Sequence, residues 1–107
     1  MVKKMELDTV FSDEIFKNSL RLLFRHAQSD TGGSKRCAQF LLGLWNGTLF
    51  KADIQDLLYT DIDINRAMLC VLYHLHGGFH QLNTYVSKEQ ITPIIDTWGD
   101  AFRVKKL

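Results

Sequence analysis

The longest apolar stretch of the chain covers residues 67–75 and is followed by a pair of glycines at 77 and 78. Asp61 and Asp63 precede it, and acidic residues at that place suit the positive end of a helix dipole. A helix that is apolar on nearly every side must be surrounded by other helices in a water-soluble chain. The pattern therefore predicts a buried central helix over residues 61–76.

Apolar residues at helical spacing predict further helices on either side of this one in the sequence. The first is capped by Ser12 and extends to about residue 28. After a turn in residues 29–34, the second includes residues 37–45 and stops at Asn46-Gly47.

A short connecting helix is predicted within residues 50–59. Its spacing predicts two groups of side chains, with Ile54, Leu57 and Leu58 facing inward and Asp53 and Asp56 facing outward.

The last helix has two candidate starts. Ser87 with Gln90 forms a capping-box sequence, whereas Thr92 would place Pro93 at the favoured first helical position, and we favour this later start slightly. Residues 1–11 lack helical periodicity and are predicted to form an N-terminal arm. Together the segments predict one all-α domain over residues 1–107, a compact bundle of about five helices.

Composition supports a single domain with its own core, because 46% of the 107 residues are hydrophobic. The apolar runs are shorter than the roughly 18 residues that a membrane helix needs, and the first residues lack the apolar region of a signal peptide. We therefore expect a cytoplasmic protein that makes no membrane contact. Cys37 and Cys70 lie in apolar helical patterns, so both are predicted to be reduced and buried.

Charge is distributed unevenly along the chain although the net charge is only +1. Residues 1–51 carry eight Lys/Arg against five Asp/Glu, whereas residues 52–102 carry two against seven. Two charged groups are candidate partner-binding residues: a basic group of Arg21, Arg25, Lys35 and Arg36 around the first interhelical turn, and an acidic group of Asp53, Asp56, Asp61 and Asp63. Simpler interpretations are an ordinary solvated rim for the basic group and helix capping for the acidic one.

Metal binding is suggested by Cys70 and His74, four residues apart, with His76 and His80 close behind. A structural zinc site is normally marked by two paired-ligand clusters such as Cys-x-x-Cys, which this chain lacks. The sequence D-I-D-I-N opens like a calcium loop, but Arg66 stands where that loop needs glycine. We therefore predict no metal site, and a core thiol with histidines at a helix end is the simpler interpretation.

Catalysis is not indicated by any motif. No serine or cysteine is set in a recognisable nucleophile motif, and T-G-G-S-K lacks the leading glycine and the preceding strand of a phosphate loop. We therefore predict a protein that is not an enzyme and needs no cofactor.

Three stretches resemble a known domain family: RLLFRHAQSDTGGSKRCAQFLLGLWNG, DIQDLLYTDIDI and IIDTWGDAF. The family has no known function and occurs in small proteins of phages, plasmids and integrated elements of proteobacteria. The resemblance covers about three quarters of the chain, from Leu20 to Trp98. It implies an accessory protein of a mobile element that binds a host protein or nucleoprotein complex. Its most concrete form is an anti-CRISPR or similar counter-defence inhibitor that occludes the complex through its charged surfaces.

Two other functions remain open. A small DNA-binding regulator would use the basic group around the first interhelical turn. A structural or dimerising protein would place Trp45 or Trp98 at its interface. The sequence does not decide between a monomer and a homodimer.

Overall fold

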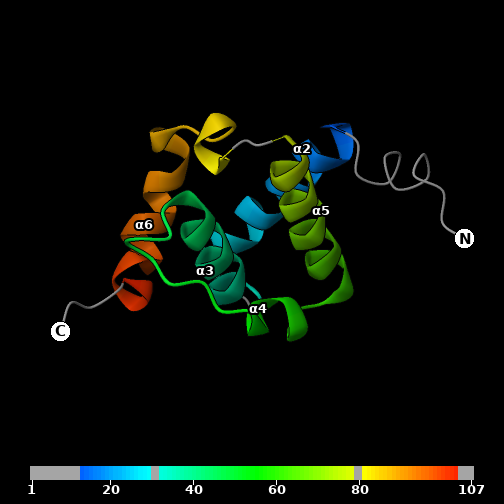
Figure 1. The fold of residues 1–107 in the computed structure, drawn as a ribbon. Helices are drawn as coiled ribbons and strands as arrows, with labels where there is room; N and C mark the ends of the chain where they lie inside the picture. The colour runs from blue at the N-terminus through cyan, green and yellow to red at the C-terminus, as the bar shows by residue number, and fades with distance from the viewer. Residues whose placement is uncertain (1–12, 30–31, 79–80, 104–107) are drawn as a thin grey trace, which may run out of the picture.

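The computed structural model describes residues 13–29, 32–78 and 81–103, and its regular structure is helical (Figure 1). The elements are α2 (Asp13–Ala27), α3 (Ser34–Trp45), α4 (Gln55–Leu58), α5 (Ile62–Gly78), the 3-10 helix η1 (Leu82–Thr84) and α6 (Lys88–Phe102). The described residues contain no β-strand; an isolated bridge between Phe50 and Arg103 is their one extended pairing. The predicted all-α bundle of about five helices is confirmed. The predicted arm at residues 1–11 lies outside the described residues.

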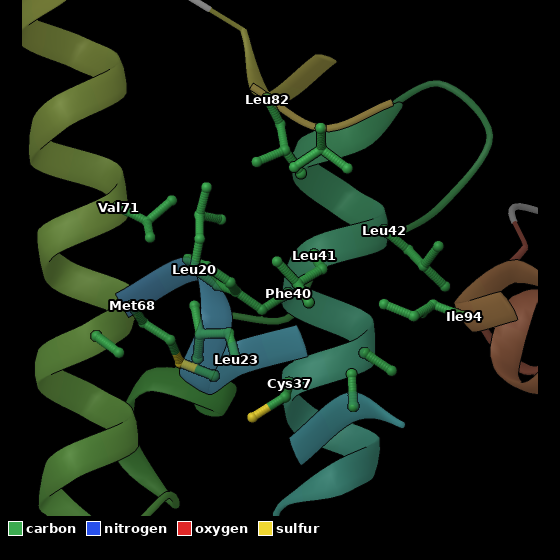
Figure 2. Packing of buried hydrophobic residues seen from close by; sticks show 14 of the residues in the cluster. Leu20, Leu23, Cys37, Phe40, Leu41, Leu42, Met68, Val71, Leu82 and Ile94 are labelled. Carbon is green, nitrogen blue, oxygen red and sulfur yellow. The ribbon is translucent and has the colours of Figure 1, made fainter. Parts of the chain in front are cut away.

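Helix α3 lies at the centre of the bundle. It packs against α2, α4, α6 and η1, whereas α5 packs mainly against α2 and α4. Figure 2 shows α3 between α5 and α6, with Met68 and Val71 pointing toward it from one side and Ile94 from the other. Leu41 and Leu42 of α3 are completely buried in this cluster. Burying such side chains contributes about 1.5–3 kcal/mol each, so this cluster is the main source of stability.

Helix α5 differs from the central helix predicted for residues 61–76. It forms, and it runs on through the glycine pair to Gly78, but it is buried on one side only. Its inner face carries Ile64, Met68 and Val71, while Ile62 and Leu69 are exposed on the outer face. The prediction that this helix is buried on nearly every side is therefore wrong. An apolar sequence alone does not distinguish a core helix from a helix with an exposed apolar face.

Helix α6 begins at Lys88, earlier than the slightly favoured start at Thr92. Ser87 forms a complete capping box: its Oγ accepts from the Gln90 N–H at 3.2 Å, and Gln90 Oε1 accepts from the Ser87 N–H at 2.8 Å. These two bonds satisfy donors that a helix start otherwise leaves unpaired. They outweigh the loss of one backbone donor at Pro93, which lies in the second turn.

Two contacts hold the ends of the bundle together. The indole Nε1–H of Trp98 donates to the Ala27 carbonyl at 2.9 Å, which ties α6 to the last residue of α2. The Lys51 N–H donates to the Phe102 carbonyl at 3.0 Å, which holds the α3–α4 connection against the end of α6. Trp98 therefore has a structural role within the chain.

Candidate interaction site

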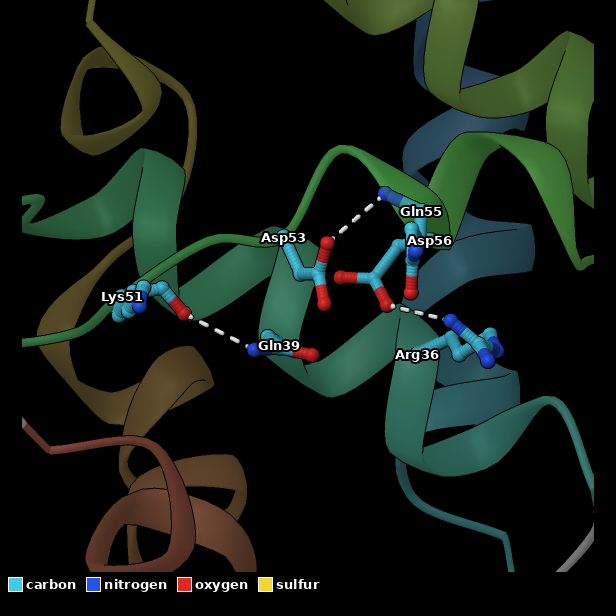
Figure 3. Close-up of polar contacts among 6 residues, drawn as sticks. All are labelled: Arg36, Gln39, Lys51, Asp53, Gln55 and Asp56. Carbon is cyan, nitrogen blue, oxygen red and sulfur yellow. Dashed lines mark hydrogen bonds and ion pairs between the residues drawn. The ribbon is translucent and has the colours of Figure 1, made fainter.

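Helix α4 is oriented by a buried ion pair. Asp56 is only 1% exposed, and its Oδ1 accepts from Arg36 Nη1 on α3 at 3.1 Å (Figure 3). The predicted outward orientation of Asp56 is therefore wrong. The attraction of Arg36 turns this face of the single-turn helix toward α3.

The environment of Asp56 opposes its charge. Burial raises the pKa of this carboxyl above its ordinary value of 3.8, and the hydrogen bond and charge of Arg36 lower it only in part. Its other oxygen, Oδ2, has no hydrogen-bond partner. Burying this ion pair costs desolvation free energy, so the pair positions α4 more than it adds to stability.

Both cysteines are free and buried, as predicted. Burial, together with the nearby Asp56 carboxylate, raises the pKa of Cys37 to about 12. Burial also raises the pKa of Cys70. Because the thiolate is the nucleophilic form, these pKa values favour a packing role for both residues over a reactive one.

The inward turn of Asp56 places apolar residues of α4 on the surface. Ile54 is 77% exposed and Leu58 is 71% exposed, so their predicted inward orientation is wrong; Leu57 is partly buried against the core, as predicted. Tyr59, which follows α4, is exposed and has the Arg36 guanidinium 5.3 Å from its ring centre.

The outer face of α5 also carries exposed apolar residues. Ile62 is 64% exposed and Leu69 is 44% exposed, and Tyr73 is exposed as well. With the exposed Arg66 and His76, these residues recur at alternating spacings of four and three, so they form one stripe along the helix. A helix that lies at the protein surface normally carries polar residues along its solvent-facing side. We call the six exposed apolar residues the α4–α5 surface: Ile54, Leu58, Tyr59, Ile62, Leu69 and Tyr73.

Three of the four predicted acidic residues border the α4–α5 surface. Asp53, Asp61 and Asp63 are all exposed. The Asp53 carboxylate accepts from the Gln55 N–H at 2.9 Å (Figure 3), and the Asp61 carbonyl accepts from the Asn65 N–H at 2.9 Å. The N-cap of α4 is Ile54, and the Asp53 carboxylate binds the first backbone N–H of the helix from one residue earlier. The three carboxylates remain exposed beside the apolar residues.

The predicted basic residues are distributed over two helices. Arg21 and Arg25 are exposed on α2, and Lys35 is exposed on α3. Arg21 donates to Asn18 Oδ1 at 2.9 Å. Arg36 contacts Asp56 and Tyr59, so it joins the acidic segment to α3 instead of belonging to a separate basic surface.

His74 packs among aromatic rings. It stacks on Phe16 with ring centres 3.9 Å apart, and its Nε2 lies 3.1 Å from the Tyr85 hydroxyl. Its Nδ1 lies 3.6 Å from Asp13 Oδ1. No three His, Cys, Asp or Glu side chains gather in a metal-binding arrangement within residues 13–29, 32–78 and 81–103, and His80 lies outside these ranges.

Comparison with known proteins gives a family but no function. A model of a family of unknown function (DUF7673) matches residues 17–99. No curated protein and no solved structure matches the chain significantly. Among the helices of the described residues, none is both long enough and apolar enough to cross a membrane.

Proposed function

The chain belongs to DUF7673, a family of unknown function, and we propose that it is a non-enzymatic accessory protein that binds another protein through the α4–α5 surface. The observation that carries this proposal is the cluster of exposed apolar side chains on α4 and along α5. Exposed apolar patches on small domains commonly mark interaction sites, because covering them removes apolar area from water.

The stripe on α5 supports a helical partner. Residues spaced alternately by four and three along one helix interdigitate with the side chains of a second helix laid beside it. The stripe from Ile62 to His76 has a length of about 21 Å at 1.5 Å per residue, which corresponds to about four helical turns of a partner. Arg66, the second of the five stripe positions, would set the register of that helix, because it needs an acidic or polar residue opposite it.

The acidic border supports a partner with basic residues around an apolar centre. Asp53, Asp61 and Asp63 would attract Lys and Arg side chains and would accelerate the encounter. Such basic surfaces are typical of proteins that handle nucleic acids. This charge complementarity supports the more concrete proposal that the chain occludes a host defence complex, as an anti-CRISPR or similar inhibitor of a phage or mobile element acting in the bacterial cytoplasm.

The test is a tagged pull-down from bacterial lysate, with and without nuclease, followed by mass spectrometry. Three forms of the chain are compared: wild type, Leu58→Glu/Leu69→Glu, and Thr97→Glu/Ala101→Glu. The last variant is a matched control, since it adds the same two charges to exposed positions on α6. Melting temperatures of all three confirm that each is folded.

The proposal expects a stoichiometric protein partner that resists nuclease, is retained by the α6 control and is lost with the α4–α5 variant. Recovery of an untagged copy of the chain would favour the dimerising alternative. Recovery that disappears with nuclease would favour the DNA-binding regulator. Equal partner recovery by all three forms would contradict the assignment of the surface.

A further inference from the structure

A groove of about 510 Å³ lies between α2 and the start of α6, and it shares no residue with the α4–α5 surface. Its apolar lining comes from both sides: Phe16, Leu20 and Phe24 along one face of α2, and Val86 and Pro93 at the start of α6. Phe16 is 1% exposed, and its ring stacks on the ring of His74 with ring centres 3.9 Å apart. The volume falls in the range of roughly 300–1,000 Å³ that is common for ligand sites.

The two rims of the groove differ in charge. Lys17 and Arg21 line it on α2, one helical turn apart, and Arg25 continues the same row one turn further. Glu89 lines the opposite rim on α6. All four side chains are exposed, so their charges are available to a ligand.

We propose that this groove is a second docking site, and that it binds an acidic peptide segment of a partner protein. A bulky apolar side chain of the segment occupies the space among Phe16, Leu20 and Phe24. Carboxylates of the segment pair with Lys17 and Arg21. Glu89 repels carboxylates from the opposite rim, so the segment binds with its acidic side toward α2.

The choice of an acidic peptide follows from the charges and the shape. An apolar groove would accept any hydrophobic segment, but two lining cations, Lys17 and Arg21, against one lining anion, Glu89, favour negative charge. The lining residues extend along α2 from Phe16 to Phe24 and on to Gln28, about three helical turns, which suits an extended or helical segment. The groove would prefer an acidic partner segment, whereas the α4–α5 surface would prefer a basic one.

The experiment is a selection of a displayed library of random short peptides on the immobilised full chain. Enriched peptides are synthesised, and their affinities are measured for four proteins: wild type, Lys17→Glu/Arg21→Glu, Glu89→Gln and the Leu58→Glu/Leu69→Glu variant of the other surface. All of these substitutions are at exposed positions, so we expect the fold to be retained, and the melting temperature of each variant checks this. Amide chemical shifts of the wild type map where each peptide binds.

The proposal expects enriched peptides that combine Asp or Glu with an aromatic or large aliphatic residue. Their affinity falls by about tenfold or more with Lys17→Glu/Arg21→Glu, because two attractions become repulsions. It rises with Glu89→Gln and is unchanged by the other surface variant. The proposal is overturned if no peptide is enriched, if the enriched peptides lack acids, or if shifts concentrate on α4 and α5.

Discussion

Helices α3 and α5 are both rich in apolar residues, but they use them differently. Helix α3 has neighbours on several sides, and its half-buried Gln39 donates to the Lys51 carbonyl at 3.1 Å. Helix α5 packs mainly against α2 and α4, and its outer face carries the exposed residues Ile62, Leu69 and Tyr73. The comparison teaches that a helix of similar apolar content can be a core helix or can keep an exposed apolar face, depending on which helices pack beside it.

The largest expected difference is in the free energy of unfolding when one leucine in each helix is replaced by alanine. Leu41→Ala on α3 removes a fully buried side chain and should lower the free energy of unfolding by about 3–5 kcal/mol. Leu69→Ala on α5 should change it by less than about 0.5 kcal/mol, because the side chain is already half in water. Denaturant titration of both variants measures the contrast. Similar losses for the two would mean that the outer face of α5 belongs to the core.

The ion pair that orients α4 can be broken from the α3 side. Arg36→Met leaves the buried Asp56 carboxylate unpaired, and we expect a loss of about 3 kcal/mol at neutral pH. Adding Asp56→Asn to that variant removes the buried charge and should restore most of the loss. Thermal unfolding of the single and double variants checks this. An Arg36→Met protein as stable as wild type would show that the substitution does not leave an unpaired buried charge at Asp56.

Close packing around α3 predicts a smaller effect at a glycine. A Cβ added at Gly43 would lie 2.6 Å from the Ala52 Cβ, so the α3–α4 connection would have to shift. Gly43→Ala should therefore cost about 1–3 kcal/mol, as overpacking does. Gly32→Ala is the control, because a Cβ there meets nothing within 4 Å. Equal unfolding midpoints for the two variants would contradict this packing.

The smallest expected effect is a pH dependence from Asp56. Its folded-state pKa is raised above 3.8, so the folded chain retains the proton at pH values where the unfolded chain has released it. The stability that this group contributes is complete below pH 3.8 and is lost as pH rises through the raised pKa. The free energy of unfolding of Asp56→Asn should therefore rise relative to that of wild type as pH increases. Unfolding titrations across this pH range measure the difference. If the relative stability of Asp56→Asn instead fell as pH increased, Arg36 would lower the pKa of Asp56 by more than burial raises it.

The sequence predicted the helices better than it predicted their outer faces. Capping residues and glycine turns located α2 and α3 closely, because these signals act within a few residues. The orientation of α4 depended on Arg36, twenty positions earlier, and a four-residue helix has too little periodicity to show which side is buried. The start of α6 was misjudged because Pro93 was weighed above the capping box of Ser87.

The candidate site was predictable only in part. Charge counting found Asp53, Asp61 and Asp63, which are exposed, but it also included the buried Asp56. The apolar stripe of α5 was predicted to be buried, because the sequence does not show which helices lie beside α5. One signal was present in the sequence: Arg66 interrupts the stripe one turn after Ile62, where a fully buried helix would not place a charge.

The most direct test of the central claim is site-specific photo-crosslinking in bacterial cells. A photoreactive amino acid is placed at Leu69 on the outer face of α5 or at Asp100, which is also exposed, on α6. The account predicts a discrete protein adduct from position 69 and none from position 100. An adduct from position 100 alone, or none from position 69, would contradict the assignment of the α4–α5 surface as the binding site.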